Sequence, residues 1–261
     1  MEYLYPSLFG LTHQSTVEIT FTSWILAFLA SFVLGISKAG VKGIAVIIIT
    51  LMALAFGARA STGLLVPLFV MGDIFAVAYY NKHAQWQYIR RFLPWMMSGV
   101  VLGVILGNDL PEDTFKVAMV IVILGSVVMM SWWDMRKSKV VPTHWGFAGI
   151  MGILAGITTM IGNLAGAFSN IFFLAMRIPK NEFIGTAAWL FLIINVFKLP
   201  FHILVWKTIT FDTLLINAKL LPGVVLGLFF GVRLVKIIRE AYYRKMILFL
   251  TALGALILLF R

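Results

Sequence analysis

The sequence predicts an all-α, polytopic membrane protein built from two inverted repeats, each a glycine-broken helical hairpin followed by three transmembrane helices. Three observations lead to this prediction: a mean hydropathy of +1.00, an order of apolar segments that occurs twice, and an uneven distribution of Lys and Arg among the loops. Hydrophobic residues make up 61% of the 261 residues and charged residues 12%. Soluble domains are about half apolar and about a quarter charged, so the composition excludes an ordinary soluble domain and a disordered chain.

The apolar segments are long enough, or nearly long enough, to cross a bilayer, which takes about 20 apolar residues. In order along the chain they are roughly 21–37, 43–57, 62–80, 92–107, 116–133, 145–161, 164–176, 183–206, 213–232 and 246–260. The longest polar loops, 134–144 and 233–245, have only 11 and 13 residues. A catalytic domain outside the bilayer is therefore excluded.

Two pairs of these segments are the halves of interrupted stretches. Each interruption is rich in glycine, and we call residues 35–43 the first break and residues 156–166 the second break. Three ordinary spans follow each interrupted pair, so the same order occurs twice. The expected organisation is an N-terminal segment 1–20, a first repeat 21–133, a basic cytoplasmic linker 134–144 and a second repeat 145–261.

Residues in corresponding places of the two halves match at nearly constant separation. The matches are Gly99, Gly103 and Gly107 with Gly223, Gly227 and Gly231 at 124 residues, Gly63 and Asp73 with Gly185 and Asn195 at 122, and Lys116 and Gly125 with Lys245 and Gly254 at 129. An ordered series over some 110 residues indicates an internal duplication.

The distribution of basic residues predicts the orientation. If each interrupted stretch is a hairpin that returns to its own side, the loops 81–91, 134–144, 177–182 and 233–245 share one side and hold 13 Lys and Arg, against 4 on the other. If each interrupted stretch crosses once, the division is 8 to 9. Because cytoplasmic loops carry the excess of Lys and Arg, we expect hairpins. Three crossings per repeat then make the repeats inverted and leave both termini outside the cytoplasm.

The two breaks are the candidate transport site, because irregular backbone at membrane depth is tolerated only inside protein or beside a watery cavity. Free N–H groups at half-helix N-termini bind anions, and neither break contains an acidic residue. We therefore expect an oxyanion site rather than a cation site. The alternative is a cytoplasmic turn whose lysines extend to the interface. The candidate binding residues are Ser37, Lys38, Gly40, Lys42, Gly43, Thr158, Thr159, Gly162, Asn163, Gly166, Asn195 and Lys198.

Asp73 is the only acidic residue well inside a predicted span, and a carboxylate there is a functional candidate by default. It is expected either to pair with Lys38, Lys42 or Lys198 and balance the charge of the site, or to carry a coupling proton. A purely structural ion pair is the competing interpretation. Lys198 lies one helical turn after Asn195, so the two side chains share a face.

Other functional classes find little support. The net charge of +11 would suggest nucleic acid in a soluble protein, but here basic loops orient the chain and contact anionic lipid. There is no cysteine, and the four histidines show no metal-binding spacing. The sequence contains no nucleophile and base at a usable spacing, so we expect neither an enzyme nor a cofactor. The oligomeric state is not predicted.

The chain resembles the sulfite exporter TauE/SafE family of bacterial permeases over about 22–260. The resemblance rests on Gly35-Ile36-Ser37-Lys38-Ala39-Gly40, Pro67, Asp73, Ala76, Tyr80, His83-Ala84, Trp86, Arg90-Arg91-Phe92-Leu93-Pro94-Trp95, Thr158-Thr159-Met160, Asn163, Gly166, Phe183-Ile184-Gly185-Thr186, Ala188-Trp189, Asn195 and Lys198-Leu199-Pro200-Phe201. It implies a multi-pass protein of the bacterial inner membrane that transports sulfur-containing anions, such as sulfite, organosulfonates or related small carboxylates.

The resulting hypothesis is a secondary transporter, with export as the expected direction, whose partners are a small anion and membrane lipids, with protons as a candidate coupling ion. Two alternatives stay open: an anion channel of the same fold, and a membrane partner protein that transports nothing. The sequence does not identify the anion.

Overall fold

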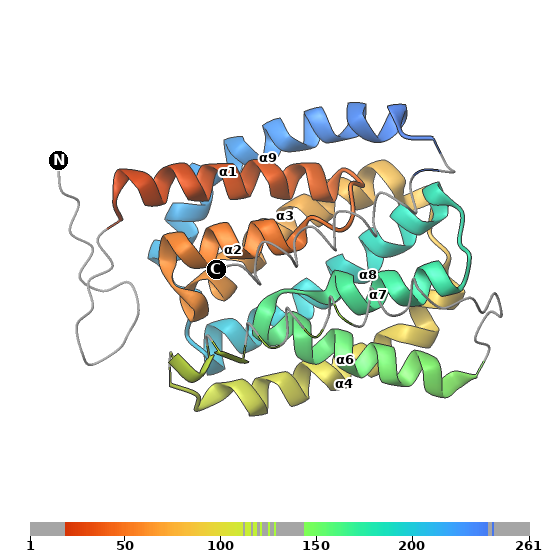
Figure 1. The fold of residues 1–261 in the computed structure, drawn as a ribbon, viewed down its shortest axis with the longest axis horizontal. Helices are drawn as coiled ribbons and strands as arrows, with labels where there is room; N and C mark the ends of the chain where they lie inside the picture. The colour runs from red at the N-terminus through yellow and green to blue at the C-terminus, as the bar shows by residue number, and fades with distance from the viewer. Residues whose placement is uncertain are drawn as a thin grey trace.

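In a computed structural model, the described part of the chain is helical (Figure 1). The structure describes residues 19–111 and 144–239, together with a few positions between 113 and 128 and Tyr242. The predicted N-terminal segment 1–20, the apolar segments 116–133 and 246–260 and the linker 134–144 lie wholly or largely outside the described residues.

The described helices of the first half match the predicted apolar segments. The first of them is capped by Thr20, whose hydroxyl accepts a hydrogen bond from the backbone N–H of Ser23. Several helices extend a few residues beyond the apolar segment, because flanking polar and basic residues continue the helix into the interface. In order they are α1 (Phe21–Lys38), α2 (Ala45–Phe56), α3 (Ala58–Tyr80), the 3₁₀ turn η1 (Asn81–His83) and α4 (Trp86–Asn108).

The second half has the same order of long and short helices. Pro200 sits where α8 passes into a single π-helical turn that continues the same rod. In order the elements are α6 (Trp145–Gly162), α7 (Ala165–Ala175), α8 (Lys180–Pro200), the π turn η2 (Phe201–Val205) and α9 (Phe211–Ile237).

Both breaks separate a long helix from a short one. Helices α2 and α7 have 12 and 11 residues, so they are roughly 18 and 16 Å long, too short for a hydrocarbon core of about 30 Å. The backbone turns through positive φ at Gly40 (123°) and Gly43 (98°) in the first break and at Asn163 (54°) in the second. Glycine and asparagine adopt this conformation at the least cost, so the glycine-rich composition explains where the helices stop.

Glycines bring two pairs of helices into close contact. A Cβ atom added at Gly35 of α1 would overlap the backbone of Val224 in α9, and one added at Gly99 of α4 would overlap the backbone of Ile153 in α6. Later glycines in α4 and α9 meet later residues of α6 and α1, so the helices of each pair run parallel. Small residues allow such close approach between membrane helices.

Helices α3 and α8 pack against each other in opposite directions. Gly185, near the start of α8, lies against the carbonyl of Tyr80 at the end of α3, whereas Gly63, near the start of α3, lies against Thr208 just after α8 and η2. The two helices therefore run alongside each other over most of their length and bring the residues at their centres together.

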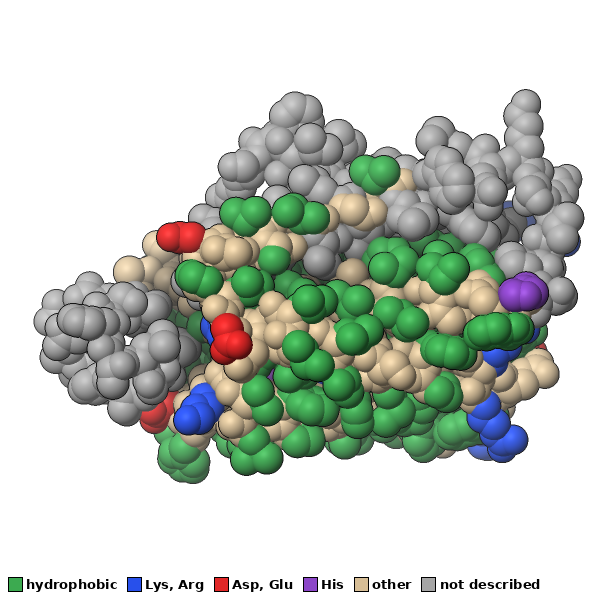
Figure 2. Space-filling view, turned by 90° about the horizontal axis from the view of Figure 1, so that it is seen from below, with side chains coloured by type: hydrophobic (Ala, Val, Ile, Leu, Met, Phe, Trp, Pro, Cys, Tyr) green, Lys and Arg blue, Asp and Glu red, His purple; other side chains and the backbone are tan. Residues whose placement is uncertain are grey.

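Within the described residues, six helical rods are long and apolar enough to cross a membrane: α1, α3 with η1, α4, α6, α8 with η2, and α9. Large apolar side chains such as Ile105, Leu204 and Phe229 are exposed on them. Figure 2 shows hydrophobic side chains over the middle of one face, with Lys and Arg side chains near its ends. A bilayer is the solvent that suits this surface, so the chain is a multi-pass membrane protein.

Candidate functional site

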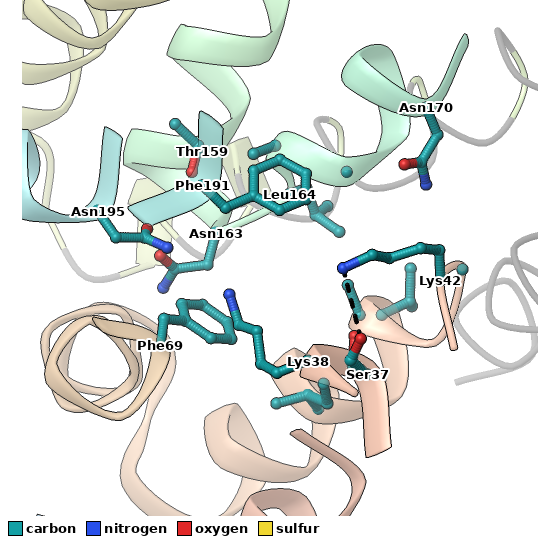
Figure 3. A pocket seen from close by; sticks show the side chains of 16 residues that line it. Ser37, Lys38, Lys42, Phe69, Thr159, Asn163, Leu164, Asn170, Phe191 and Asn195 are labelled. Carbon is teal, nitrogen blue, oxygen red and sulfur yellow. Dashed lines mark hydrogen bonds between the residues drawn. The ribbon is translucent and has the colours of Figure 1, made fainter. Parts of the chain in front are cut away.

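A cavity lies where the two breaks approach each other (Figure 3). Its walls come from both breaks, from the first residues of α2 and α7, and from the middles of α3 and α8. The cavity volume is about 70 Å³, which gives room for roughly five water molecules or one small ligand. Eight predicted site residues line it: Ser37, Lys38, Lys42, Gly43, Thr159, Asn163, Gly166 and Asn195.

Lys38, the last residue of α1, forms an ion pair with Asp73 of α3. The distance from Lys38 Nζ to Asp73 Oδ1 is 2.7 Å, and both side chains are buried. The ring of Phe69, one turn before Asp73, lies 4.5 Å from the ammonium. A buried charge requires a counter-charge, and each member of this pair supplies it to the other. Lys38 therefore adds no net charge to the cavity.

The carboxylate of Asp73 also connects α3 to α8. Its Oδ2 accepts a hydrogen bond of 2.7 Å from the Nδ2 of Asn195, and the Oδ1 of Asn195 accepts one of 3.4 Å from Lys198 Nζ. Both oxygens of Asp73 thus accept from N–H donors, which is the arrangement of an ionised carboxylate. Asp73 thus connects Lys38 of the first break to Asn195 in the second half.

Lys198 of α8 holds the second break in place. Its Nζ donates to Asn163 Oδ1 at 2.6 Å, to the backbone oxygen of Thr159 at 3.0 Å and to the hydroxyl of Thr159 at 3.2 Å. Asn163 in turn donates from Nδ2 to the backbone oxygen of Thr62 at 3.1 Å. Because Lys198 is fully buried and its protons are used on these groups, it positions the break.

Lys42 is the lysine of the cavity wall with the fewest partners. Its side chain is buried, its Nζ donates one long hydrogen bond of 3.5 Å to the backbone oxygen of Ser37, and it lies 5.4 Å from the ring of Phe191. Among the described residues, no carboxylate lies within ion-pair distance of it. Lys42 therefore presents an ammonium without a counter-ion to the cavity.

Two helix N-termini border the same cavity. Helices α2 and α7 begin after Ile44 and Leu164, and neither of these residues makes a side-chain capping hydrogen bond. Gly43 and Gly166, at the two helix starts, line the cavity. Uncapped N-termini present backbone N–H donors and a positive partial charge. Together with the Lys42 ammonium, they make this cavity suited to an anion.

The other five predicted site residues do not line the cavity: Gly40, Asp73, Thr158, Gly162 and Lys198. Asp73 and Lys198 stand behind the wall and hold residues that form it. The hydroxyl of Thr158 donates back into its own helix, to the backbone oxygen of Ala155 at 3.2 Å. Gly40 forms the turn of the first break, against the side chains of Ile184 and Val235.

The wall residues that sequence reasoning missed include Phe69, Phe191 and Asn170. Phe69 and Phe191 are 122 residues apart, the separation of the matched pairs Gly63 and Gly185, so an extended repeat comparison could have found them. One signal pointed to Asn170: it is one of two adjacent polar residues, Ser169 and Asn170, within the apolar run 165–175.

The comparison with family models gives one match to this chain. The model described as Sulfite exporter TauE/SafE matches residues 24–258, which include both breaks and all residues of the cavity wall. Searches of curated proteins and of solved structures give no match. Members of this family are membrane transporters rather than enzymes. With the helical membrane fold and the anion-suited cavity, the match over most of the chain shows that the protein belongs to the sulfite exporter TauE/SafE family.

Proposed function

We propose that the protein is a secondary transporter that exports small sulfur-containing or organic oxyanions, such as sulfite, sulfonates or related carboxylates, across the bacterial inner membrane. The observation that carries the proposal is the ammonium of Lys42, buried on the cavity wall without a counter-ion among the described residues. An anion bound beside it would supply the missing charge and accept hydrogen bonds from the N-termini of α2 and α7.

Inverted repeats form part of the proposal, and residue pairs at the centre support them. Phe69 and Phe191 are 122 residues apart, and so are Asp73 and Asn195. The two rings both line the cavity, and the two polar side chains are joined by a hydrogen bond. Residues in contact at equal separation are expected around a two-fold axis that relates one half to the other.

Two helix-end contacts at opposite ends of the described helices also support inverted repeats. Arg59, in the first turn of α3, donates to backbone oxygens at the end of α4, including Leu110 at 3.0 Å. Lys180, the first residue of α8, donates to backbone oxygens at the end of α9, including Val235 at 2.9 Å. Each half thus joins the start of one helix to the end of the next by a basic side chain, as expected if the halves are duplicates with opposite orientation.

Uptake into proteoliposomes that contain the full-length protein tests the function. The panel consists of sulfite, sulfoacetate, taurine, thiosulfate and simple carboxylates, each with and without an imposed proton gradient. A transporter gives saturable uptake of at least one anion, and dependence on the gradient identifies protons as the coupling ion. Flux that rises without saturation indicates a channel. No flux of any anion in a folded preparation indicates a partner protein that transports nothing.

A charge-removing variant tests the site. Lys42→Gln is expected to weaken anion binding about tenfold or more, because a hydrogen bond to a charged group contributes about 1.5–3 kcal/mol. The matched control is Lys219→Gln, which removes a lysine from α9 whose Nζ lies 5.4 Å from the ring of Trp24, outside the cavity wall. Equal affinity of the wild type and the Lys42 variant would place the anion elsewhere.

A further inference from the structure

Asn170 is a buried polar residue of the cavity wall that the proposed anion site does not use. It lies in α7 and is 3% exposed. The oxygen of its side-chain amide has no hydrogen-bond partner among the described residues. In Figure 3 its side chain lies on the same side of the cavity as Lys42.

Each of the other two side-chain amides of the wall already donates and accepts a hydrogen bond within the protein. Asn163 donates to Thr62 and accepts from Lys198, and Asn195 donates to Asp73 and accepts from Lys198. The amide oxygens of these two residues therefore already have a partner, unlike the amide oxygen of Asn170. Among the side-chain amides of the described wall, Asn170 is therefore the one whose oxygen can accept a hydrogen bond from a ligand.

The chemistry of this acceptor restricts the ligand. A fully deprotonated oxyanion brings only acceptors, so it can bind to Lys42 and to the helix N-termini but not to an amide oxygen. A buried acceptor without a partner is unfavourable. The amide oxygen of Asn170 is satisfied by a ligand that carries an N–H or O–H group in addition to its negative charge.

We infer that Asn170 is a specificity-determining residue, which selects anions that carry a hydrogen-bond donor beside the charged group. The inference rests on the proposed transport of anions and narrows its substrate class. The charged group binds at Lys42 and the starts of α2 and α7, and the donor binds to Asn170. The donor is either a hydroxyl or amino group of an organic anion or the proton of a singly protonated oxyanion.

Matched ligands test the inference on the purified full-length protein in lipid nanodiscs. Ethanesulfonate and hydroxyethanesulfonate differ by one hydroxyl group, and titration calorimetry measures the affinity of each. The wild type is expected to bind the hydroxylated anion about tenfold more tightly, as a satisfied hydrogen bond in a buried site predicts. Asn170→Leu is expected to bring the ratio close to one by weakening only the hydroxylated anion. A second arm measures the affinity for sulfite at pH values on both sides of its second ionisation. Tighter binding of the singly protonated anion would show that the proton of the oxyanion itself serves as the donor.

The neighbouring residue provides the control. Ser169 is buried in the same helix but does not line the cavity, so Ser169→Ala is expected to keep the wild-type ratio. If Asn170→Leu does not fold, Asn170→Ala serves the same comparison, since alanine also lacks the acceptor. If a folded Asn170 variant keeps the wild-type ratio of the affinities for the two sulfonates, the inference is overturned. Equal binding of both sulfonates, with no pH effect on sulfite, also overturns it but leaves anion transport standing, whereas no binding of any anion by the wild type contradicts the proposed function itself.

Discussion

The amide of Asn195 donates a hydrogen bond of 2.7 Å to the carboxylate of Asp73, which lies 122 residues earlier in the chain. The same carboxylate accepts from Lys38 at 2.7 Å, so one buried group joins the end of α1, the middle of α3 and the middle of α8. The hydrogen bond to Asn195 connects the two proposed repeats, whereas the ion pair lies within the first. Perturbing each partner separately should therefore have different consequences.

Removal of the Asp73 charge is expected to lower stability. Asp73→Asn keeps the size of the side chain but leaves Lys38 as a buried cation without its counter-ion, and breaking a buried pair in this way costs about 3–5 kcal/mol. The double variant Asp73→Asn with Lys38→Gln removes both charges and should recover much of the loss. Thermal unfolding in nanodiscs measures both effects. A single variant as stable as the wild type would show that the pair is not the main counter-charge of Lys38.

Cysteine labelling in intact cells is expected to separate the two ends of the described helices. Lys82 in η1 and Lys207 after η2 are both exposed and lie at opposite ends of the α3–α8 pair, and the chain has no cysteine of its own. If the basic loops are cytoplasmic, an impermeant thiol reagent added outside should label Lys207→Cys but not Lys82→Cys. The reverse pattern would contradict the predicted orientation.

The helices and both breaks could be predicted from the sequence because they depend on local composition. A long apolar run directly indicates a membrane span, and glycine indicates a backbone conformation that other residues avoid. The equivalence of Asp73 and Asn195 was also visible, as a repeat match, whereas their hydrogen bond was not predicted. The sequence could not decide which of three lysines pairs with Asp73, because that depends on how α1, α3 and α8 pack.

The roles of the site residues were harder to predict than their location. Asn163 and Lys198 stay predicted anion ligands, and in the structure they form hydrogen bonds with each other, with Thr159 and with Thr62. Whether a polar group faces a ligand or its own protein is decided by neighbours far apart in the chain. For the same reason Asn170, which follows Ser169 in an otherwise apolar helix, could not be assigned to the wall from the sequence.

Helix contact at Gly156 is expected to tolerate no side chain. A Cβ atom there would overlap the backbone of Met96 and Gly99 in α4, where neither helix can yield without moving. Gly156→Ala should therefore destabilise the protein by about 1–3 kcal/mol, as overpacking does. Gly125→Ala is the matched control, because a Cβ atom at Gly125 meets no atom of the described residues within 4 Å. Equal melting temperatures of the two variants would mean that α4 and α6 are not closely packed.

Lys198 is expected to contribute to the stability of the protein, and Lys42 to the binding of the anion. Lys198→Met removes the donors to Thr159 and Asn163, and hydrogen bonds to charged groups contribute about 1.5–3 kcal/mol each. We expect a clear loss of thermal stability without ligand. Lys42→Gln should not lower stability, because it removes a buried charge that has no counter-ion among the described residues, while it weakens anion binding. Loss of stability in the Lys42 variant alone would reverse these assignments.

The last prediction concerns the role of Asp73 in coupling, where two interpretations remain in competition. Both of its oxygens accept hydrogen bonds from Lys38 and Asn195, and a protonated carboxyl group would have to give up one of these contacts. We therefore expect Asp73 to act as a fixed counter-ion that balances charge.

The double variant Asp73→Asn with Lys38→Gln separates these interpretations, because it removes titration while it restores neutrality. If Asp73 is a fixed counter-ion, proteoliposomes that contain this variant should still accumulate the anion under a proton gradient, at a pH dependence like that of the wild type. If Asp73 carries the coupling proton, accumulation should disappear while exchange of labelled for unlabelled anion at equilibrium survives. Measuring accumulation and exchange on the same vesicles also identifies a variant that has simply lost its fold, since both rates then vanish together.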